Sequence, residues 1–470
     1  MQSFNEMPVR ASNLFIFIIY HSALQKLFAI LKTMKVQSFF KTVSRAVLLI
    51  FIAASFALAQ NAPNYPEPQQ EKLLNGLKLL IWNDSQAPKV TVKLRIHNGA
   101  AFDPKDKMGV MALVADILFP TGQTKEFFRE ELQGSLDVAT NYDYIEITAT
   151  GKADEIQTIL ETIAAAVTKP PITKENFALV RDARLAKVRA LEKNPDYVAE
   201  RAAAKRLYGD FPYGRSAEGT SESLAKIERA DLLQAEERFF TADNATLAVV
   251  GNVNRDFVYR AARRLFGAWQ KSQQTIPATF RLPDPPNTQT LAIEMPESDR
   301  FVSRMAMNVA ARNDKDFYAT QILTRIWQKQ FCLNNDAYFG KSDYQPYLLR
   351  GLYTVSKNVI YGKESLPINS GNCQLLLVKD GRIAYPPITQ SDFETAKAAV
   401  LQDHQRKSLS DVADFWLDVD TYRLVSVKDE MSKLNNVTLA DAQRVAEKLQ
   451  KEPTVSIVVK RAEAAAAAKQ

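Results

Sequence analysis

The stretch that decides the fold assignment is Gly109-Val-Met-Ala-Leu-Val-Ala-Asp-Ile-Leu-Phe-Pro-Thr-Gly122. Its apolar residues recur at helical spacing, at Val110, Leu113, Val114, Ile117 and Leu118. Pro120 and Gly122 then end the pattern. This spacing predicts a buried helix, and its own side chains carry no group typical of catalysis.

Strands are predicted on both sides of this helix. Residues 77–82 and 89–96 alternate between apolar and polar positions, as half-buried strands do. After the helix, residues 132–140 and 144–150 form a predicted hairpin around a short polar corner.

Helices follow the hairpin. They are predicted over residues 155–167, 174–191, 199–207 and 256–266, with another that ends near Phe240. A strand is predicted over residues 245–251, before the last of these helices.

A similar unit recurs in the second half of the chain. The segment Pro170-Pro-Ile-Thr-Lys-Glu-Asn-Phe177 recurs as Pro386-Pro-Ile-Thr-Gln-Ser-Asp-Phe393, an offset of 216 in the numbering. Ala230-Asp231 is matched by Ala440-Asp441, an offset of 210, and the strand at 246–250 is matched at 454–458, an offset of 208. Three matches in one order, with offsets that change only slightly, indicate two tandem copies of one domain.

Strands and long helices in each copy predict the α+β class, with a sheet covered by helices. The expected organisation is a leader over residues 1–59, a first domain over 60–271, a linker over 272–290, a second domain over 291–460 and an Ala-rich tail over 461–470. The linker is rich in Pro, Gln and Thr, as inter-domain segments often are.

The leader has the features of a signal peptide. Residues 46–59 are apolar, follow three basic residues, and close in Ala57-Leu58-Ala59, the small-x-small pattern that signal peptidase cuts. We expect a true start at Met34, cleavage before Gln60, and export to the periplasm or cell envelope. The run is shorter than the roughly 20 residues that span a bilayer. An uncleaved anchor helix is the alternative.

Composition argues against some classes of function. Six of the 60 Lys and Arg residues and one of the 53 Asp and Glu residues lie in the leader, so most of the formal net charge of +7 leaves with it. No basic run with interleaved aromatic residues is present, which argues against nucleic-acid binding. Cys332 and Cys373 form either one disulfide of an exported protein or two buried thiols.

Three groups of residues occur in the order and at the spacing of a known family. They are Gly134 with Ala139-Thr140 and Asp143, the stretch Leu207-Tyr-Gly-Asp-Phe-Pro-Tyr-Gly-Arg215, and Asp243-Asn-Ala-Thr-Leu-Ala-Val-Val-Gly251. They resemble the substrate-binding hairpin, the His-Pro-Tyr-Gly loop with Phe211 in place of the His, and the strand that closes the first domain of the insulinase/pitrilysin metallopeptidases. These inverzincins include the mitochondrial processing peptidase. The resemblance covers nearly all of the mature chain and implies two homologous domains with mixed, mostly antiparallel sheets in a half-clamshell.

The zinc motif of that family, His-x-x-Glu-His, is absent at the matching positions. In the motif, two His residues four apart lie on one helix face and hold zinc, and the Glu acts on the zinc-bound water. Counted from Gly109, the first His falls on Ala112, the Glu on Ala115 and the second His on Asp116. The third ligand, a Glu on a later helix, falls near Ala186, Lys187 or Val188. The resemblance therefore implies no catalytic residue, no metal ligand and no cofactor in this chain.

The histidine count agrees with this expectation. Only His97 and His404 follow the leader, in opposite halves and without a second His or Cys at ligand spacing. We interpret both as structural or solvated residues. Asp116, on an apolar helix, is expected to cap a neighbouring group or to pair with a cation, because a single carboxylate is weak evidence for catalysis.

Active relatives use an Arg and a Tyr seven residues later to hold the substrate, and this spacing does not occur after residue 290. The nearest candidates are Arg350 and Tyr353, with aromatic packing of a sheet as the alternative. The candidate peptide-binding residues are therefore Gly134, Ala139, Thr140, Arg350 and Tyr353.

Bacterial members of the family often occur as pairs in which one subunit lacks the zinc motif, and this chain resembles that subunit. The resemblance implies a non-catalytic, exported subunit of a heterodimeric zinc peptidase that forms part of the chamber for a peptide or unfolded polypeptide. Zinc is expected in the partner, and an edge strand near residues 132–140 would add backbone hydrogen bonds to the peptide. No nucleic-acid partner and no stable membrane span after signal cleavage are expected. The alternatives are a divergent zinc metalloendopeptidase in its own right and an envelope scaffold protein.

Overall fold

A computed structural model describes residues 65–272, 280–331, 340–360, 378–379, 382–383, 386–405 and 407–462. The predictions for the leader, for the pairing of Cys332 with Cys373 and for residues 463–470 of the tail lie outside these ranges. No helix within them combines the length and the apolar character needed to cross a lipid bilayer.

The first sheet has six strands. They are β1 (Gln69–Lys72), β2 (Lys78–Asn83), β3 (Lys89–Ile96), β4 (Ser135–Thr140), β5 (Ile145–Lys152) and β6 (Ala245–Gly251). Their order is β1-β2-β6-β3-β5-β4, in which β2 and β6 are parallel and the other neighbours are antiparallel. Buried and partly exposed residues alternate along β5, whereas every residue of β6 is buried because both of its faces are covered.

The second sheet has five strands, and a short hairpin lies outside it. The strands are β7 (Leu291–Glu294), β8 (Arg300–Val309), β9 (Gly340–Pro346), β10 (Gly351–Ile360) and β13 (Thr454–Lys460), and the hairpin is β11 (Val378–Lys379) with β12 (Arg382–Ile383). The order is β7-β13-β8-β10-β9. Here β7 and β13 are parallel, and the other neighbours are antiparallel.

The two sheets have the same topology. The order β2-β6-β3-β5-β4 corresponds strand by strand to β7-β13-β8-β10-β9, and the parallel pair β2–β6 corresponds to the parallel pair β7–β13. The predicted α+β class with two tandem homologous domains is therefore confirmed. The boundary between the domains, placed at residues 272–290 from the sequence, stays a prediction.

The helices of the first copy largely match the sequence pattern. They are α3 (Val110–Ile117), α4 (Gln123–Glu130), α5 (Ile156–Thr168), α6 (Lys174–Leu191), α7 (Pro195–Tyr208), α8 (Ser221–Lys226), α9 (Arg229–Phe239) and α10 (Arg255–Phe266). Helix α7 begins four residues before its predicted start, because the side chain of Asn194 caps it and Pro195 takes its first position. Helix α4 is absent from the prediction, since Phe128 is its one buried residue and no apolar stripe forms.

The second copy repeats this series. Its helices are α11 (Phe317–Gln330), α12 (Gln390–Gln405), α13 (Leu409–Thr421), α14 (Val427–Asn436) and α15 (Leu439–Leu449). Helix α12 follows the second copy of the Pro-Pro-Ile-Thr segment as α6 follows the first, and α15 contains Ala440-Asp441 as α9 contains Ala230-Asp231. The repeated segments of the sequence therefore lie on equivalent helices.

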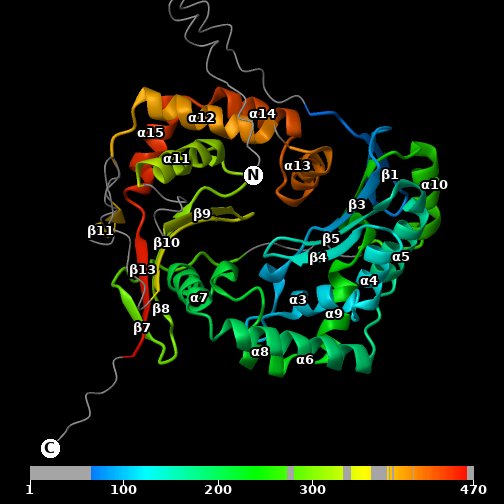
Figure 1. Cartoon of the computed structure of the whole chain (residues 1–470), viewed down its shortest axis with the longest axis horizontal. Helices are drawn as coiled ribbons and strands as arrows, with labels where there is room; N and C mark the ends of the chain where they lie inside the picture. Colours follow the sequence, from blue (N-terminus) through cyan, green and yellow to red (C-terminus); the bar gives the residue numbers. More distant parts are fainter. Residues whose placement is uncertain are drawn as a thin grey trace, which may run out of the picture. The chain divides into compact units, whose positions relative to one another are not determined.

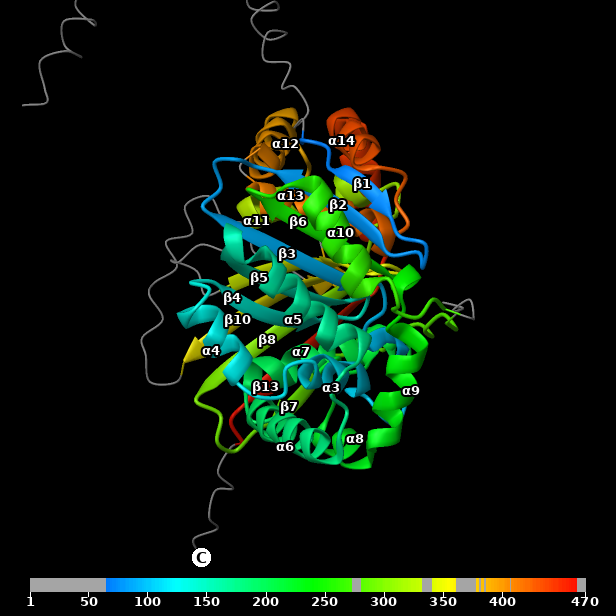
Figure 2. The same ribbon diagram turned by 90° about the vertical axis from the view of Figure 1, so that its right-hand side faces the viewer.

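Each sheet has helices of its own copy on one face. Helix α5 packs on β3 and β5 of the first sheet, and α10 packs beside it on β2 (Figure 2). In the second copy, α11 packs on β9 and is backed by α12 and α15 (Figure 1).

The other face of each sheet is covered by a helix of the opposite copy. Helix α7 of the first copy packs on β8 and β13 of the second sheet (Figure 1). Helix α13 of the second copy packs on β6, where Trp416 and Leu417 meet Leu80 and Trp82 of β2. Helix α7 directly follows α6, and α13 directly follows the equivalent helix α12, so α7 and α13 are equivalent elements that the copies exchange.

Candidate functional site

The start of α3 is held by a buried carboxylate. Asp103 accepts hydrogen bonds from the backbone N–H groups of Gly109 at 2.7 Å and Met111 at 2.8 Å. Burial raises the pKa of Asp103 to about 7. Gly109 has a φ of +99°, and a Cβ there would lie 3.0 Å from the Cα of Gly219, so this turn requires glycine.

The three positions that the sequence assigned to the zinc motif lie on α3, and two of them carry no metal-binding group. Ala112 and Ala115 are buried in the helix interface, and a methyl group cannot ligate a metal. The side chain of Asp116 is 35% exposed and lies at the edge of the core.

The carboxylate of Asp116 is occupied by an arginine from α6. Arg184 donates from Nε to Oδ2 of Asp116 at 2.8 Å and from Nη2 to Oδ1 at 2.7 Å, a bidentate pair. Its Nη1 donates to Glu218, to which Lys187 also donates at 2.9 Å. Two carboxylates and two cations therefore form one closed ionic cluster between α3, α6 and the loop before α8.

Two members of this cluster, Arg184 and Glu218, have pKa values that are shifted in favour of their charged forms. Burial alone would lower the pKa of Arg184, but the hydrogen bonds and charges of Asp116 and Glu218 outweigh it and raise that pKa. Burial would raise the pKa of Glu218, yet Lys187 and Arg184 lower it. Since both Asp116 oxygens accept from a guanidinium, and a cation already lies beside them, these residues do not fit a zinc ion.

The described residues contain no group of three or more His, Cys, Asp or Glu side chains placed to hold a metal ion.

The sequence placed the third ligand position near Ala186, Lys187 or Val188, but the residue that reaches α3 is Arg184. Val188 is fully buried, Ala186 is exposed, and the side chain of Lys187 is 55% exposed. One signal for Arg184 was present: it lies on the buried face of α6 with Phe177, Val180 and Val188. A charged residue in an apolar helical stripe predicts a buried ion pair.

Three of the five peptide-binding candidates lie on or beside the edge strand β4. A Cβ on Gly134 would lie 1.9 Å from the carbonyl oxygen of Thr150, so the close approach of the two backbones requires glycine there. Ala139 is exposed and Thr140 is partly exposed, on a strand that has one neighbour in the sheet. The strand therefore offers unpaired backbone groups along its outer side.

The other two candidates lie at the second sheet and do not form one site. Arg350 is half-buried, with its guanidinium 6.0 Å from the ring centre of Phe211. Tyr353 is only 2% exposed and packs against Trp327 at 5.5 Å between ring centres. The structure places Tyr353 in the core, where a peptide at the surface cannot contact it, because β10 is covered by α11.

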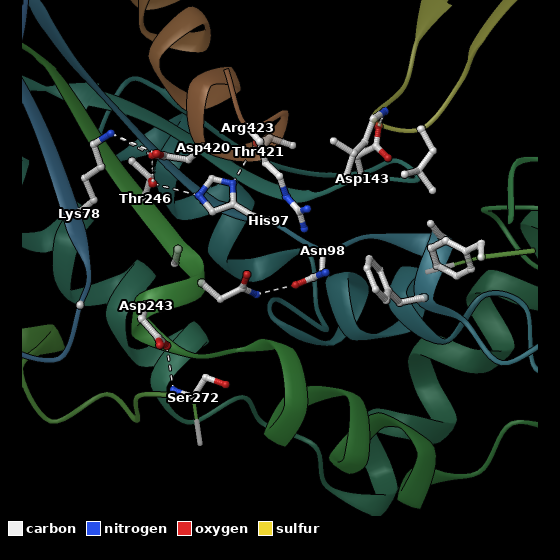
Figure 3. Close-up of a pocket in the computed structure, with 18 of the residues that line it drawn as sticks. Lys78, His97, Asn98, Asp143, Asp243, Thr246, Ser272, Asp420, Thr421 and Arg423 are labelled. Carbon is white, nitrogen blue, oxygen red and sulfur yellow. Dashed lines mark hydrogen bonds and ion pairs between the residues drawn. The ribbon is translucent and has the colours of Figure 1, made fainter. Parts of the chain in front are cut away.

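A cavity of about 420 Å³ lies where β3, β6, α13 and the loop before β10 meet (Figure 3). His97 lies in its wall, with Nδ1 2.9 Å from the hydroxyl of Thr421 and Nε2 3.0 Å from the hydroxyl of Thr246 (Figure 3). Thr246 donates to Asp420, which is paired with Lys78 at 3.2 Å. Burial lowers the pKa of His97 to about 4, so the ring is neutral at physiological pH.

Asp143 also lines this cavity and is almost fully buried. Its carboxylate accepts from the hydroxyl of Tyr213 at 3.0 Å and from the backbone N–H of Leu348 at 2.9 Å. Burial raises its pKa to about 7. Sequence reasoning assigned Asp143 only to the corner after β4, because its contact with the second copy is not visible in local patterns.

His404 lies apart from this cavity. Its Nδ1 is 2.9 Å from the hydroxyl of Tyr65, and its ring stacks on Phe415 with 5.2 Å between ring centres.

Two family models match the chain. Insulinase (peptidase family M16) matches residues 78–221, and the peptidase M16 inactive domain matches residues 226–330. Together they span more than half of the sequence. The chain belongs to the insulinase family. The resemblance inferred from the sequence is thereby confirmed.

The relatives that the chain matches include an uncharacterized zinc protease, a non-peptidase homolog and a subunit of a processing peptidase. An uncharacterized zinc protease of Rickettsia felis is 23% identical over 44% of this chain and 52% of its own length. The non-peptidase homolog YmxG of Helicobacter pylori is 22% identical over 45% of this chain and 49% of its length. The beta subunit of the mitochondrial-processing peptidase of Saccharomyces cerevisiae is 21% identical over 45% and 47%. The aligned part spans about half the length of these relatives.

A solved structure supports the insulinase-family fold over most of the chain. The crystal structure of a protease from Helicobacter pylori covers 84% of this chain and 100% of its own, with a TM-score of 0.73 and 16% identity. At that identity the similarity concerns the fold alone. The assignment of Ala112, Ala115 and Asp116 to the positions of the zinc motif stays a prediction from the sequence.

Proposed function

We propose that this chain is a non-catalytic, exported subunit of an insulinase-family zinc peptidase complex. In this proposal it forms one wall of a chamber that holds a peptide or unfolded polypeptide. The zinc ion and the water that it activates belong to a partner subunit with an intact His-x-x-Glu-His motif, and this chain holds no cofactor of its own.

The observation that carries the proposal is the bidentate pair between Arg184 and Asp116. A guanidinium held 2.7–2.8 Å from both oxygens of Asp116 places a positive charge beside the carboxylate, where a metal ion would have to bind. The two buried alanines of α3 supply no donor. The cluster supports a structural role for this region, since it joins α3 to α6.

The edge strand β4 supports a role in peptide binding. Its outer side can accept an extended peptide as an additional strand, which requires only backbone hydrogen bonds and so tolerates varied sequences. The similarity to a subunit of the mitochondrial-processing peptidase supports a heteromeric assembly in general. Export is supported by the apolar run and small-x-small site before Gln60.

The test is to purify the chain from Gln60 onward and to measure its zinc content and peptidase activity. The measurements are made on the chain alone and after mixing with a zinc-motif relative from the same cell. We expect neither stoichiometric zinc nor activity alone, and activity on mixing. One zinc per chain together with activity alone would overturn the proposal in favour of the divergent zinc peptidase.

A mutation locates the chemistry within the complex. Asp116→Ala should leave the activity of the mixed complex within a few-fold of the wild type, whereas replacing the motif Glu of the partner should abolish it. A loss of several orders of magnitude from a well-folded Asp116→Ala chain would contradict a non-catalytic role.

A scaffold protein of the cell envelope is the second candidate, which the similarity to a non-peptidase homolog favours. A stable complex without peptidase activity, seen in the same mixing experiment, would favour it over the first proposal.

A further inference from the structure

The cavity of Figure 3 contains two cations for which the described residues provide no partner. The side chains of Lys72 and Arg423, both exposed residues at the rim, make no ion pair or hydrogen bond to any of those residues, whereas the third cation, Lys78, is paired with Asp420. The guanidinium of Arg423 extends into the cavity beside Asn98 (Figure 3). An unpaired guanidinium in a partly enclosed cavity is suited to bind a carboxylate, because its planar donors match the two oxygens.

The backbone position of Arg423 is one that glycine normally occupies. Arg423 follows the end of α13 and has a φ of +55°, in the left-handed region. The N–H of Leu424 bonds back to the carbonyl of Val419 at 2.9 Å, as in the helix-ending motif that favours glycine. Helix α7, the equivalent element, ends differently, because its C-cap residue is Gly209 with a φ of +56° and a ψ of −123°. An arginine at this position of α13 is strained, because a Cβ crowds the backbone in the left-handed region.

Asn98 supplies a second donor. It is 5% exposed, and its Oδ1 accepts from Nδ2 of Asn244 at 2.8 Å. Its own Nδ2 therefore has no acceptor among the described residues and lines the cavity (Figure 3). This amide group is open to the cavity, where an oxygen of a ligand can accept its hydrogen bond.

The acidic residues of the wall already have partners of their own. Asp420 is paired with Lys78, Asp243 accepts from the backbone N–H of Ser272 at 2.8 Å, and Asp143 accepts the two hydrogen bonds described above. The groups left over are donors and cations, so the cavity is complementary to an anion.

Another part of the wall is apolar and includes Phe102 and Leu349. The volume of about 420 Å³ is within the range of small-ligand sites. We propose that this cavity binds the carboxyl-terminal residue of a peptide, with the carboxylate on Arg423 and Asn98 and an apolar side chain against Phe102 and Leu349. The site goes beyond the proposed function, because none of its lining residues belongs to α3 or β4 and it requires no partner subunit.

The test is calorimetric titration of the chain from Gln60 onward, without a partner, with N-acetyl-Ala-Phe as the free acid and as the amide. We expect the acid to bind and the amide to bind about 10- to 100-fold more weakly, as for the loss of a charged hydrogen bond. Arg423→Gly should weaken binding of the acid to a similar extent while the fold is retained, because glycine suits the left-handed backbone.

Two further variants complete the test. Asn98→Asp keeps the oxygen that accepts from Asn244 and replaces the donor by a negative charge, so it should also weaken binding of the acid. Lys451→Gly is the control: it removes an exposed cation in the turn after α15, outside the cavity, and should bind as the wild type does. Equal binding of acid and amide, wild-type affinity in both cavity variants, or no binding at about 1 mM peptide would overturn the proposal.

Discussion

At the level of single residues, Arg184 makes a set of contacts that no other side chain could make. It meets two carboxylates on different elements, with two donors on Asp116 and a third on Glu218. A lysine has one ammonium group and could not hold Asp116 in a bidentate pair. The planar guanidinium therefore ties α3 to α6 at the level of the degenerate zinc motif.

Removing this side chain should destabilise the protein. Arg184→Ala leaves Asp116 and Glu218 without the cation between them, at a cost of about 2–3 kcal/mol in the free energy of unfolding. This is below the usual range for a buried pair, because both carboxylates are 35% exposed. The measurement is urea denaturation of the chain from Gln60 onward.

Arg181→Ala is the matched control on the same helix. Arg181 pairs with its neighbour Asp182 near the surface, so its removal should change stability by about 0.5 kcal/mol or less. Equal losses for the two variants would show that the Arg184 cluster has no special role.

The raised pKa of Asp143 predicts that the stability of the protein depends on pH. The pKa of Asp143 in the folded chain is raised to about 7, above the ordinary value near 4. Between about pH 4 and pH 7 this carboxyl group is therefore protonated in the folded chain and ionised in the unfolded chain. The stability from this proton is fully present below about pH 4 and is lost as the pH rises to about 7.

The measurement compares wild type with Asp143→Asn by urea denaturation at pH 5 and pH 7. The wild type should lose stability relative to the variant, by at most about 1.4 kcal/mol per pH unit. Asp210→Asn is the control: two lysines lower the pKa of Asp210 to about 2, so its carboxylate is ionised throughout this range. If the difference in the free energy of unfolding between wild type and Asp143→Asn were the same at pH 5 and pH 7, the raised pKa would be contradicted.

At the level of elements, the exchange of α7 and α13 explains the burial pattern of the sheets. A sheet with helices on one face only would show alternating burial along each strand, as β5 does. Strand β6 is buried throughout because α13 lies on its second face, where Trp416 meets Trp82 at 5.5 Å between ring centres. An element from the far half of the chain thus completes the first core.

A substitution in α13 should measure this contact. Leu417 is fully buried against the first sheet, so Leu417→Ala should cost about 2–5 kcal/mol in the free energy of unfolding. Leu233→Ala on α9 is the matched control, because this leucine is 37% exposed and should lose about 0.5 kcal/mol. Thermal and urea denaturation measure both. A small loss for Leu417→Ala would mean that α13 contributes little to the first core.

For the whole molecule, the exchange makes the two copies interdependent. Residues 60–271 alone would leave β6 without its covering helix and would expose the apolar face of α7, and residues 291–460 alone would expose the matching surfaces. The halves produced separately should therefore aggregate, whereas halves produced together should form a soluble complex.

Size-exclusion chromatography and circular dichroism of the separate and co-produced halves test this expectation. Two halves that are each soluble, monomeric and folded with native helix and strand content on their own would contradict it. The full chain, produced in parallel, is the control for losses during purification.

The sequence by itself determined the class and most of the elements, because these depend on local spacing. The pattern of residues 174–191 predicts α6 with its observed bounds, and that of residues 245–251 predicts β6. The nearly constant offset between matching segments predicted the tandem copies. The sequence also shows directly that α3 carries no pair of histidines. Each of these inferences compares residues that are close in sequence or equivalent in two copies.

Only the tertiary structure decided what those elements contact. An amphipathic helix has an apolar face, but nothing in its spacing says which sheet covers it, so the exchange of α7 and α13 was not predictable. Arg184 was visible as a charge on an apolar stripe, yet its partner Asp116 lies 68 residues earlier. The cavity around Arg423 joins segments that are distant along the chain. Contacts of this kind depend on how whole elements pack, which local patterns do not encode.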